Sequence, residues 1–232
     1  MGLRQWENLP AFMKCGEVKE YYDILNKKRG ALAAKRIFDV LMSLFLLSVL
    51  ALPMLIIAIL IKLDSKGPVF YRQERVTTYG RKFRIHKFRT MVQNADRIGT
   101  AVTVGADARI TKIGSKLRNL RLDELPQLFD VLAGDMSFVG TRPEATKYVK
   151  CYTKEMYATL LLPAGITSEA SIRYKDEAKF LDVADDVDKV YVEDVLPDKM
   201  KYNLRSIKKF SIWSDLRTMI RTVFAVLGKD YE

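Results

Sequence analysis

The feature that most constrains this chain is an uninterrupted apolar run at residues 40–61, which reads VLMSLFLLSVLALPMLIIAILI and carries no charge. As a straight helix rising about 1.5 Å per residue, such a run reaches roughly 33 Å, enough to cross the hydrocarbon core of a bilayer. A helix buried in a soluble core is the alternative, but a run that is apolar on every face offers no polar side to water. We therefore expect this segment to lie in a membrane.

The charges that flank the run predict that both of its ends lie on the same side of the membrane. Lysine and arginine dominate residues 27–36, which contain no acid, and also residues 62–89. The cations are Lys27, Lys28, Arg29, Lys35 and Arg36 upstream, and Lys62, Lys66, Arg72, Arg75, Arg81, Lys82, Arg84, Lys87 and Arg89 downstream. Because cationic flanks favour the cytoplasm, a single crossing cannot satisfy both ends, whereas a re-entrant hairpin can.

Pro53, near the middle of the run, is the candidate for the membrane break in such a hairpin. Proline removes a backbone donor and can kink the helix or divide it into two arms that are each too short to cross alone. On residue physics alone, a tolerated proline in an ordinary spanning helix is an equal alternative. We expect Asp39, at the entry, to lie beside Lys35 or Arg36 at the interface, because a charge in lipid costs several kcal/mol.

Composition restricts both the partners and the chemistry. The formal net charge of +11 predicts partners with negative charge, whether nucleic acid, anionic lipid or a phosphorylated small molecule. Cys15 and Cys151 are far apart, which argues against a disulfide framework and a cysteine zinc site. The single histidine, His86, does not lie in the sequence pattern that a Ser-His-Asp triad or an H-E-x-x-H zinc site requires. Acid-base or nucleophilic work therefore falls mainly to carboxylates.

We expect three segments: a soluble N-terminal extension at residues 1–34, a re-entrant membrane helix at 35–62 and a cytoplasmic catalytic domain at 63–232. Several elements of the last segment can be predicted from hydrophobic period and turn residues. They are a hairpin from residues 68–71 and 83–88, a loop at 94–109, a helix from Leu125 to Gly134, a helix at 148–162, a turn at 163–165, and an acidic, solvated stretch at 182–194.

The C-terminal region predicts an amphipathic helix. Its apolar stripe contains Trp213, Leu216, Ile220, Val223, Phe224 and Leu227. We expect the stripe to pack on the domain core, and the alternative is a helix that lies on the membrane surface.

Asp123 and Glu124 are the candidate catalytic pair. Adjacent acids at the start of a helix often only complement the helix dipole. Here Arg118 and Arg121 precede them, and Arg142 follows after one helix and a turn. A carboxylate can attack phosphorus to form an acyl phosphate, and its neighbour can hold a Mg²⁺ ion that bridges phosphate oxygens. The pattern therefore indicates phosphoryl transfer.

A second basic motif, HKFRTM at residues 86–91, follows the membrane segment closely. Taken alone, it fits a substrate-binding role and a basic strand bound to lipid head groups equally well.

Several motifs in this order resemble the monotopic phosphoglycosyl transferases, also called bacterial sugar transferases, over about residues 35–227. They are KRIFD at 35–39, GPVF at 67–70, KFRTM at 87–91, and the block from LDELPQL to GDMSFVGTRP at 122–143. Members of this family begin capsule, exopolysaccharide and glycoprotein glycan assembly. The resemblance implies an α+β, helix-rich fold at the inner membrane. A compact cytoplasmic catalytic domain would carry a re-entrant helix broken at Pro53 and amphipathic interfacial helices.

The resemblance also implies a ping-pong reaction. Asp123 would attack the sugar-bearing phosphate of a UDP-sugar, release UMP and hold the phosphosugar until undecaprenyl phosphate displaces it. Glu124 would bind Mg²⁺, and Lys87, Arg118 and Arg142 would bind phosphate or nucleotide and stabilise charge. Membrane lipid and downstream glycosyltransferases are the other expected partners, and nucleic acid is not one.

Three departures from the family pattern bear on these expectations. Leu52-Pro53 stands where the family often has Ser-Pro, and GTRP at residues 140–143 replaces GPRP while keeping the arginine. Residues 164–171 read AGITSEAS where many members have PGITGLAQ. A change of sugar or uridine specificity is expected if that loop shapes the donor pocket.

Two other classes of function fit some of these residues. A membrane-tethered nucleic-acid-binding protein would explain the basic charge and the aromatic residues Tyr79, Phe83 and Phe88, but the chain has no helix-turn-helix, RRM or zinc signature. A non-catalytic scaffold would be favoured by the loss of Asp123 or Glu124, and both are present.

Overall fold

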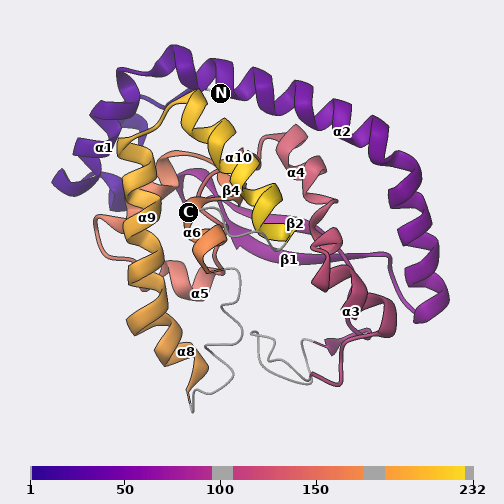
Figure 1. The fold of residues 1–232 in the computed structure, drawn as a ribbon. Helices are drawn as coiled ribbons and strands as arrows, with labels where there is room; N and C mark the ends of the chain where they lie inside the picture. Colours follow the sequence, from indigo (N-terminus) through magenta and orange to yellow (C-terminus); the bar gives the residue numbers. More distant parts are fainter. Residues whose placement is uncertain (1, 96–106, 175–185, 228–232) are drawn as a thin grey trace.

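The longest element is helix α2, Arg29–Asp64, in the computed structural model, which describes residues 2–95, 107–174 and 186–227. The helix continues through Pro53, and its two halves run in different directions, so that it arches over the rest of the chain (Figure 1). Within the described residues, it is the one helix long and apolar enough to cross a membrane. The predicted apolar helix is therefore present, although Pro53 does not interrupt it.

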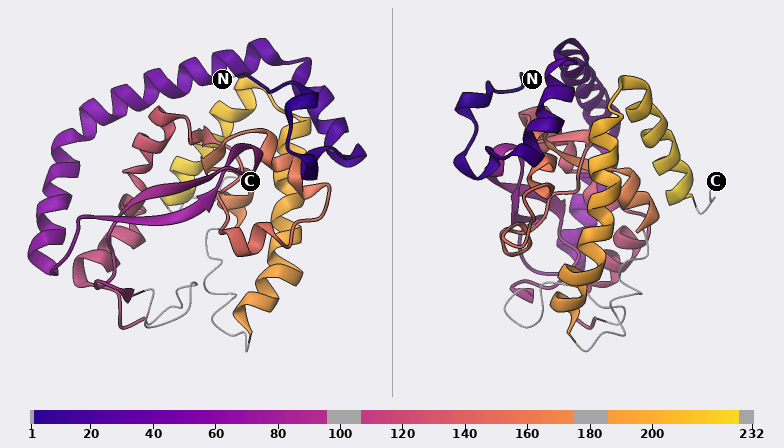
Figure 2. Two further views of the ribbon diagram at one scale, coloured as in Figure 1. Left: turned by 180° about the vertical axis from the view of Figure 1, so that it is seen from behind. Right: turned by 90° about the vertical axis from the view of Figure 1, so that its left-hand side faces the viewer.

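Both ends of α2 are fastened to the same globular domain. Arg36 donates hydrogen bonds to the carbonyls of Val131 and Leu132, at 2.6 and 2.8 Å. At the other end, the Asp64 carboxylate accepts a 3.0 Å hydrogen bond from the backbone N–H of Ile113. Figure 2 shows the helix meeting the domain at its two ends. The outward face between them is apolar and exposed, with Ile37, Leu41, Leu44, Phe45, Val49, Leu52, Leu55, Ile56, Ile59, Leu60 and Leu63.

Asp39 lies close to Lys35, as expected, and both residues line one small cavity at the start of the apolar run. Lys35 forms its ion pair with Asp215, at 2.5 Å. Asp39 is 2% exposed and accepts a 3.3 Å hydrogen bond from the backbone N–H of Phe138. The acid thus lies against a domain strand, because burial at that strand supplies a donor that lipid cannot.

Two small sheets support the domain. Strands β1 (Phe70–Val76) and β2 (Lys82–Phe88) form the predicted antiparallel hairpin, in which Phe70 pairs with Phe88. Strands β3 (Met136–Val139) and β4 (Ala164–Thr167) pair in parallel. The turn predicted at residues 163–165 is therefore wrong. Gly140 and Gly165 approach so closely that a Cβ on either would meet the other's backbone, a long-range contact with no local signature.

The predicted helix at residues 148–162 is also wrong. Helix α5 (Thr146–Val149) stops early, and the chain resumes as the 3₁₀ segment η6 (Met156–Leu161). Between them, the Thr153 hydroxyl accepts a hydrogen bond from the N–H of Met156. A threonine side chain that bonds to nearby backbone favours a new start over a continuing helix.

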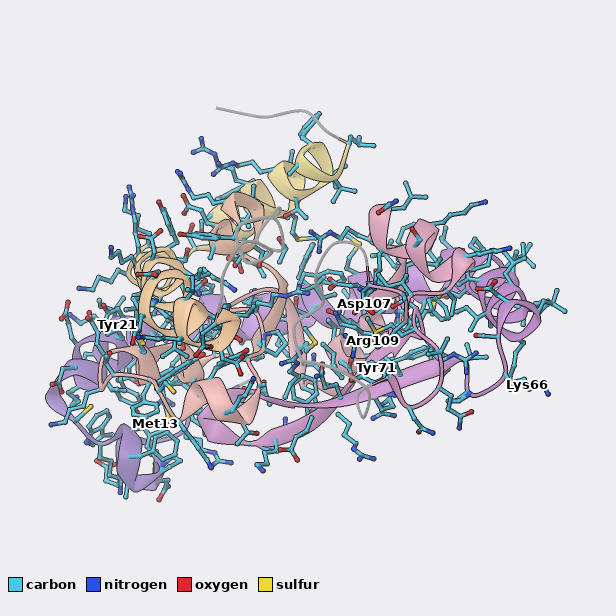
Figure 3. All side chains as sticks on the ribbon, turned by 90° about the horizontal axis from the view of Figure 1, so that it is seen from below. Met13, Tyr21, Lys66, Tyr71, Asp107 and Arg109 are labelled. Carbon is cyan, nitrogen blue, oxygen red and sulfur yellow. The ribbon has the colours of Figure 1, made fainter. Side chains whose placement is uncertain are left out.

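The N-terminal segment packs into the core of the domain. It contains η1 (Trp6–Asn8), η2 (Ala11–Met13) and helix α1 (Gly16–Asn26). Met13, Val18 and Leu25 are fully buried in a cluster that also contains residues of η6 and of helix α9 (Leu196–Lys208). The hydroxyl of Tyr21 donates a 2.5 Å hydrogen bond to Glu155. Figure 3 shows Met13 and Tyr21 at one end of the molecule.

The remaining helices complete the domain. They are α3 (Lys112–Asn119), α4 (Gln127–Ala133), α6 (Glu169–Arg173), α8 (Val187–Val190), the π-helical turn η7 (Tyr191–Val195) and α10 (Ile212–Val226). Helix α4 is the one predicted to end at Gly134, which has φ 88°.

The acidic stretch predicted at residues 182–194 is described from residue 186 onward, and 182–185 lie outside the described part of the chain. The Asp188 carboxylate is exposed, as predicted, but it also accepts hydrogen bonds from Lys147 and Tyr148. This end of the stretch is therefore bonded to the domain as well as solvated.

Helix α10 presents part of its apolar stripe outward, whereas the sequence favoured packing of the whole stripe on the core; Leu216 and Phe224 are half-buried. Trp213 is 80% exposed, and Ile220 and Val223 are 58% and 59% exposed. The helix attaches to the domain through Met219, which packs against the core, and through polar bonds that include the 2.7 Å hydrogen bond between Thr222 and Thr167. The amphipathic helix is confirmed, and Trp213, Ile220 and Val223 are left exposed on its surface.

Candidate active site

A cavity of about 980 Å³ opens between the β1–β2 hairpin, the segment after β2, α3 and the 3₁₀ turn η5 (Leu122–Glu124). Its described charged lining is strongly cationic: Arg72, Arg75, Lys87, Arg89, Arg109, Arg118, Arg121 and Arg142 face Asp123 and Glu124. A concave surface with such an excess of positive charge fits a ligand with several negative charges.

All five predicted active-site residues line this cavity, although they come from four places in the chain. Strand β2 contributes Lys87, and α3 contributes Arg118 near its C-terminal end. Asp123 and Glu124 lie on η5, which directly precedes the N-terminal end of α4. Arg142 follows β3. The fold thus brings the predicted set together, while the role of each residue stays a prediction.

Glu124 is held firmly by two cations. Its Oε1 atom accepts hydrogen bonds from Lys87 Nζ at 2.9 Å and from Arg142 Nη2 at 2.5 Å. Its side chain is 12% exposed. Burial alone would raise the pKa of this carboxyl, but Arg142 and Lys87 outweigh burial and hold the pKa well below its usual range. Glu124 is therefore an anion fixed in place.

Asp123 contrasts with its neighbour. Among the residues that the structure describes, its carboxylate has no hydrogen-bond or ion-pair partner. Burial raises the pKa of Asp123, against the lowering effect of Lys87, and the charge of Glu124 adds to the increase. A desolvated carboxylate without a partner is more nucleophilic than one whose oxygens are bonded.

Arg118 is positioned by the packing of α3 on the KFRTM motif. Thr111 caps the helix by accepting a hydrogen bond from the N–H of Gly114, and a Cβ on Gly114 would meet the backbone of Thr90. One turn later on the same face, Arg118 Nε donates a 2.9 Å hydrogen bond to Thr90 Oγ1. This contact fixes the guanidinium at the cavity wall. Burial lowers the pKa of Arg118, opposed mainly by Asp123.

The pKa of Lys87 follows the same balance. Burial lowers it, Glu124 raises it, and Arg142 adds to the decrease. Lys87, Glu124 and Arg142 therefore form one electrostatic cluster, held by the ion pairs of Glu124 with the two cations.

Sequence reasoning did not select Tyr71, Gln73 and Arg75 as functional residues, yet all three line the cavity. They alternate along β1, and Tyr71 pairs with Lys87 across the hairpin. The period of two, combined with the hairpin register, would have placed them on the face of Lys87. Burial lowers the pKa of Arg75.

Arg109, at the end of the predicted loop at residues 94–109, also lines the cavity, although 96–106 lie outside the described residues. Its guanidinium bonds to the Asp107 carboxylate at 2.6 Å and to the Ala95 carbonyl at 2.8 Å. The hydrogen bonds from Arg109 lower the pKa of Asp107 to about 2. Figure 3 shows Asp107 and Arg109 close to one another.

The donor set fits a Mg²⁺ ion that is shared with a substrate. Glu124 Oε2 has only a 3.4 Å contact with Arg142, and the Asp123 carboxylate is free of partners among the described residues. No group of three acidic, histidine or cysteine side chains that could hold a metal occurs in the described ranges. Mg²⁺ is usually bound by one or two carboxylates together with substrate phosphates, and this arrangement provides those carboxylates.

The segment at residues 164–171 does not line this cavity in the described structure. Ser168 and Glu169 instead line a second cavity of about 350 Å³, which shares no lining residue with the first. The unusual residues at 168–171 are therefore not part of the described wall around Asp123.

Comparison with known proteins gives the family context of this site. The model of the bacterial sugar transferase family matches residues 30–229. The UDP-N-acetylgalactosamine-undecaprenyl-phosphate N-acetylgalactosaminephosphotransferase of Aeromonas hydrophila is 36% identical over 197 residues, which cover 83% of this chain and 43% of the relative.

Two further relatives are named UDP-glucose:undecaprenyl-phosphate glucose-1-phosphate transferase. That of Xanthomonas campestris pv. campestris is 35% identical over 220 residues, 89% of this chain and 43% of the relative. That of Caulobacter vibrioides is 34% identical over 199 residues, 84% of this chain and 70% of the relative. The match thus spans less than half of the first two relatives but most of the third.

Proposed function

Because the chain belongs to the bacterial sugar transferase family, we propose that it is a phosphoglycosyl transferase that moves a sugar 1-phosphate from a UDP-sugar to undecaprenyl phosphate and releases UMP. The names of the relatives support both the acceptor and the class of donor. The observation that carries the proposal is the contrast within one cationic cavity between Asp123, which has no partner among the described residues, and Glu124, which two cations hold. One carboxylate is free to react, and the other is fixed.

In the first step, an Asp123 oxygen attacks the phosphorus that bears the sugar. A bond forms between that oxygen and phosphorus, and the bond from phosphorus to the bridging oxygen of the diphosphate breaks. The electron pair leaves with UMP. In the second step, an oxygen of undecaprenyl phosphate attacks the same phosphorus and expels the Asp123 carboxylate. The reaction is thus ping-pong with a covalent aspartyl-phosphosugar intermediate.

The cations of the cavity stabilise the charge that moves in both steps. Arg118 and Arg142 present guanidinium groups that can each bind two phosphate oxygens, and Lys87 adds a point charge beside them. Such positioning and electrostatic stabilisation supply most of the acceleration in phosphoryl transfer. Glu124 Oε2 would hold Mg²⁺, which supplies charge neutralisation at the diphosphate when bound.

We further propose that α2 enters the membrane from the cytoplasmic side and returns to it. Arg36 and Asp64 bond to the same domain near the two ends of the helix, which supports a location of both ends on one side. The exposed apolar face between them is the part that would contact lipid. Cationic flanks at both ends favour the cytoplasmic side. The domain would then begin glycan assembly at the inner membrane.

The topology can be tested by cysteine labelling in intact vesicles, after Cys15 and Cys151 are replaced by serine. Single cysteines introduced at Gly30 and Lys66 should react with an impermeant maleimide from the same side. Labelling of the two sites from opposite sides would rule out the re-entrant arrangement.

The reaction is tested by UMP release from a panel of UDP-sugars with undecaprenyl phosphate and Mg²⁺. Asp123→Asn should abolish release, whereas Asp188→Asn, which alters an exposed ion pair, should leave it unchanged. Release that survives in Asp123→Asn would overturn the proposed nucleophile. The donor that supports release identifies the sugar.

A further inference from the structure

The second cavity, of about 350 Å³, lies between α9, α10 and the start of α6. Its charges are unevenly paired. Lys35 and Asp215 neutralise each other at 2.5 Å, and Glu169 lies 3.7 Å from Arg173. Four cations remain on its wall without a side-chain hydrogen bond or ion pair to any described residue: Arg205, Lys209, Arg217 and Arg221. A concave site with four uncompensated positive charges fits a phosphate-bearing ligand.

The position of two of these cations identifies the kind of ligand. Arg217 and Arg221 are one turn apart on α10, so they share a face of the helix. The adjoining face carries Trp213, Ile220 and Val223, which are all more than half exposed. The helix therefore places a charged cavity directly beside an apolar surface that the described residues leave exposed. This order of charge and apolar surface matches the order of a phospholipid from headgroup to acyl chain.

From this arrangement, we propose that the cavity between α9 and α10 binds the headgroup phosphate of an anionic membrane phospholipid, while Trp213, Ile220 and Val223 of α10 lie among the acyl chains. The site is separate from the cavity that holds Asp123, because the two have no lining residue in common. The inference rests on the membrane location proposed above but not on the transfer reaction. Its role is to hold the C-terminal helix, and with it the domain, at a membrane surface rich in acidic lipid.

The test uses Trp213 as a reporter in the full chain, reconstituted in vesicles of phosphatidylglycerol and phosphatidylcholine in equal amounts. Trp6→Phe removes the other tryptophan and keeps an aromatic ring beside Tyr22. Bromines are placed on the acyl chains of one lipid at a time. Quenching of Trp213 should be about twofold or more stronger with brominated phosphatidylglycerol, since each basic residue near the surface favours acidic lipid.

Arg217→Gln with Arg221→Gln should bring the quenching ratio close to one. The matched control, Lys150→Gln with Lys154→Gln, removes the same charge from exposed residues outside the cavity and should keep the preference. Three results would each overturn the proposal. The first is a quenching ratio of one in the protein with both arginines, the second is a preference for the acidic lipid that survives in the arginine double variant, and the third is an equal loss of that preference in the lysine control.

Two further outcomes would point to a different ligand or a different location of α10. If inorganic phosphate removes the preference for acidic lipid and chloride at equal ionic strength does not, the ligand is a small free anion and the lipid assignment is overturned. Absence of quenching with either brominated lipid would place α10 away from the membrane and overturn its interfacial location as well. UMP release is measured on the same samples, so that a failure of the lipid site can be distinguished from a failure of the proposed reaction.

Discussion

Gly114→Ala gives a sharp test of how α3 holds Arg118. Gly114 lies in the first turn of α3, where alanine is ordinarily the better helix former by about 1 kcal/mol. The added Cβ, however, would lie 2.6 Å from the carbonyl carbon and 2.7 Å from the Cα of Thr90. Carbon atoms in contact are normally about 3.5 Å apart, so the helix must move by about 1 Å. Overpacking of this kind costs about 1–3 kcal/mol, which after the gain in helix propensity leaves a net loss of stability of about 0–2 kcal/mol.

The larger effect is expected on catalysis. Arg118 follows Gly114 by one turn and bonds to Thr90, the residue that the new methyl group would push away. A displacement of about 1 Å at a charged group that stabilises the reaction can reduce the rate by about 100-fold. UMP release should therefore fall far more than the free energy of unfolding, which is followed by thermal or denaturant unfolding in detergent.

Gly30→Ala is the matched control, because Gly30 is also helical and has no atom within 4 Å of an added Cβ. It should leave activity unchanged and stability unchanged or slightly raised, because alanine is the better helix former. If Gly114→Ala behaves like this control, with activity retained and stability unchanged or raised, then the contact of α3 with Thr90 does not position Arg118.

Three other substitutions test the site and the core. Lys87 lowers the pKa of Asp123, so Lys87→Met should raise the pKa of that carboxyl. The acid limb of the kcat/KM profile for UMP release should then move to higher pH, whereas in the control Lys150→Met it should not move. Glu124→Gln removes a charged ligand of the proposed metal, so the Mg²⁺ concentration for half-maximal activity should rise by about tenfold or more, and an unchanged midpoint would contradict that role. Met13→Ala should lower the free energy of unfolding by about 2–5 kcal/mol, because this side chain is fully buried; an unchanged stability would contradict the place of the N-terminal segment in the core.

The parts of the fold that were predicted correctly are those with a local signature. The apolar run predicted α2, period and turn residues predicted the β1–β2 hairpin, and Gly134 marked the end of α4. The candidate site was also predicted to include Asp123, Glu124 and their basic neighbours, because spacing in the sequence and family motifs point to the same residues.

The errors arose where a distant contact decides the conformation. Residues 163–165 have the composition of a turn, but β4 forms in a parallel pair with β3, and Gly165 approaches Gly140 just after β3. The whole stripe of α10 was expected in the core, whereas Trp213, Ile220 and Val223 are exposed, and Lys35 and Thr167 hold the opposite side of the helix through polar bonds. Contacts between residues that are distant in the chain cannot be predicted from the local pattern of a single sequence.

The central claim is that Asp123 becomes covalently bonded to a phosphosugar, and intact-protein mass spectrometry tests it most directly. The purified protein is incubated with the UDP-sugar that supports UMP release and with Mg²⁺, in the absence of undecaprenyl phosphate, and then quenched in acid. We predict a mass increase equal to one sugar phosphate, which disappears when undecaprenyl phosphate is added and is absent in Asp123→Asn. An adduct that forms equally in Asp123→Asn, or a protein that turns over rapidly with no adduct on Asp123 under any quench, would contradict the account.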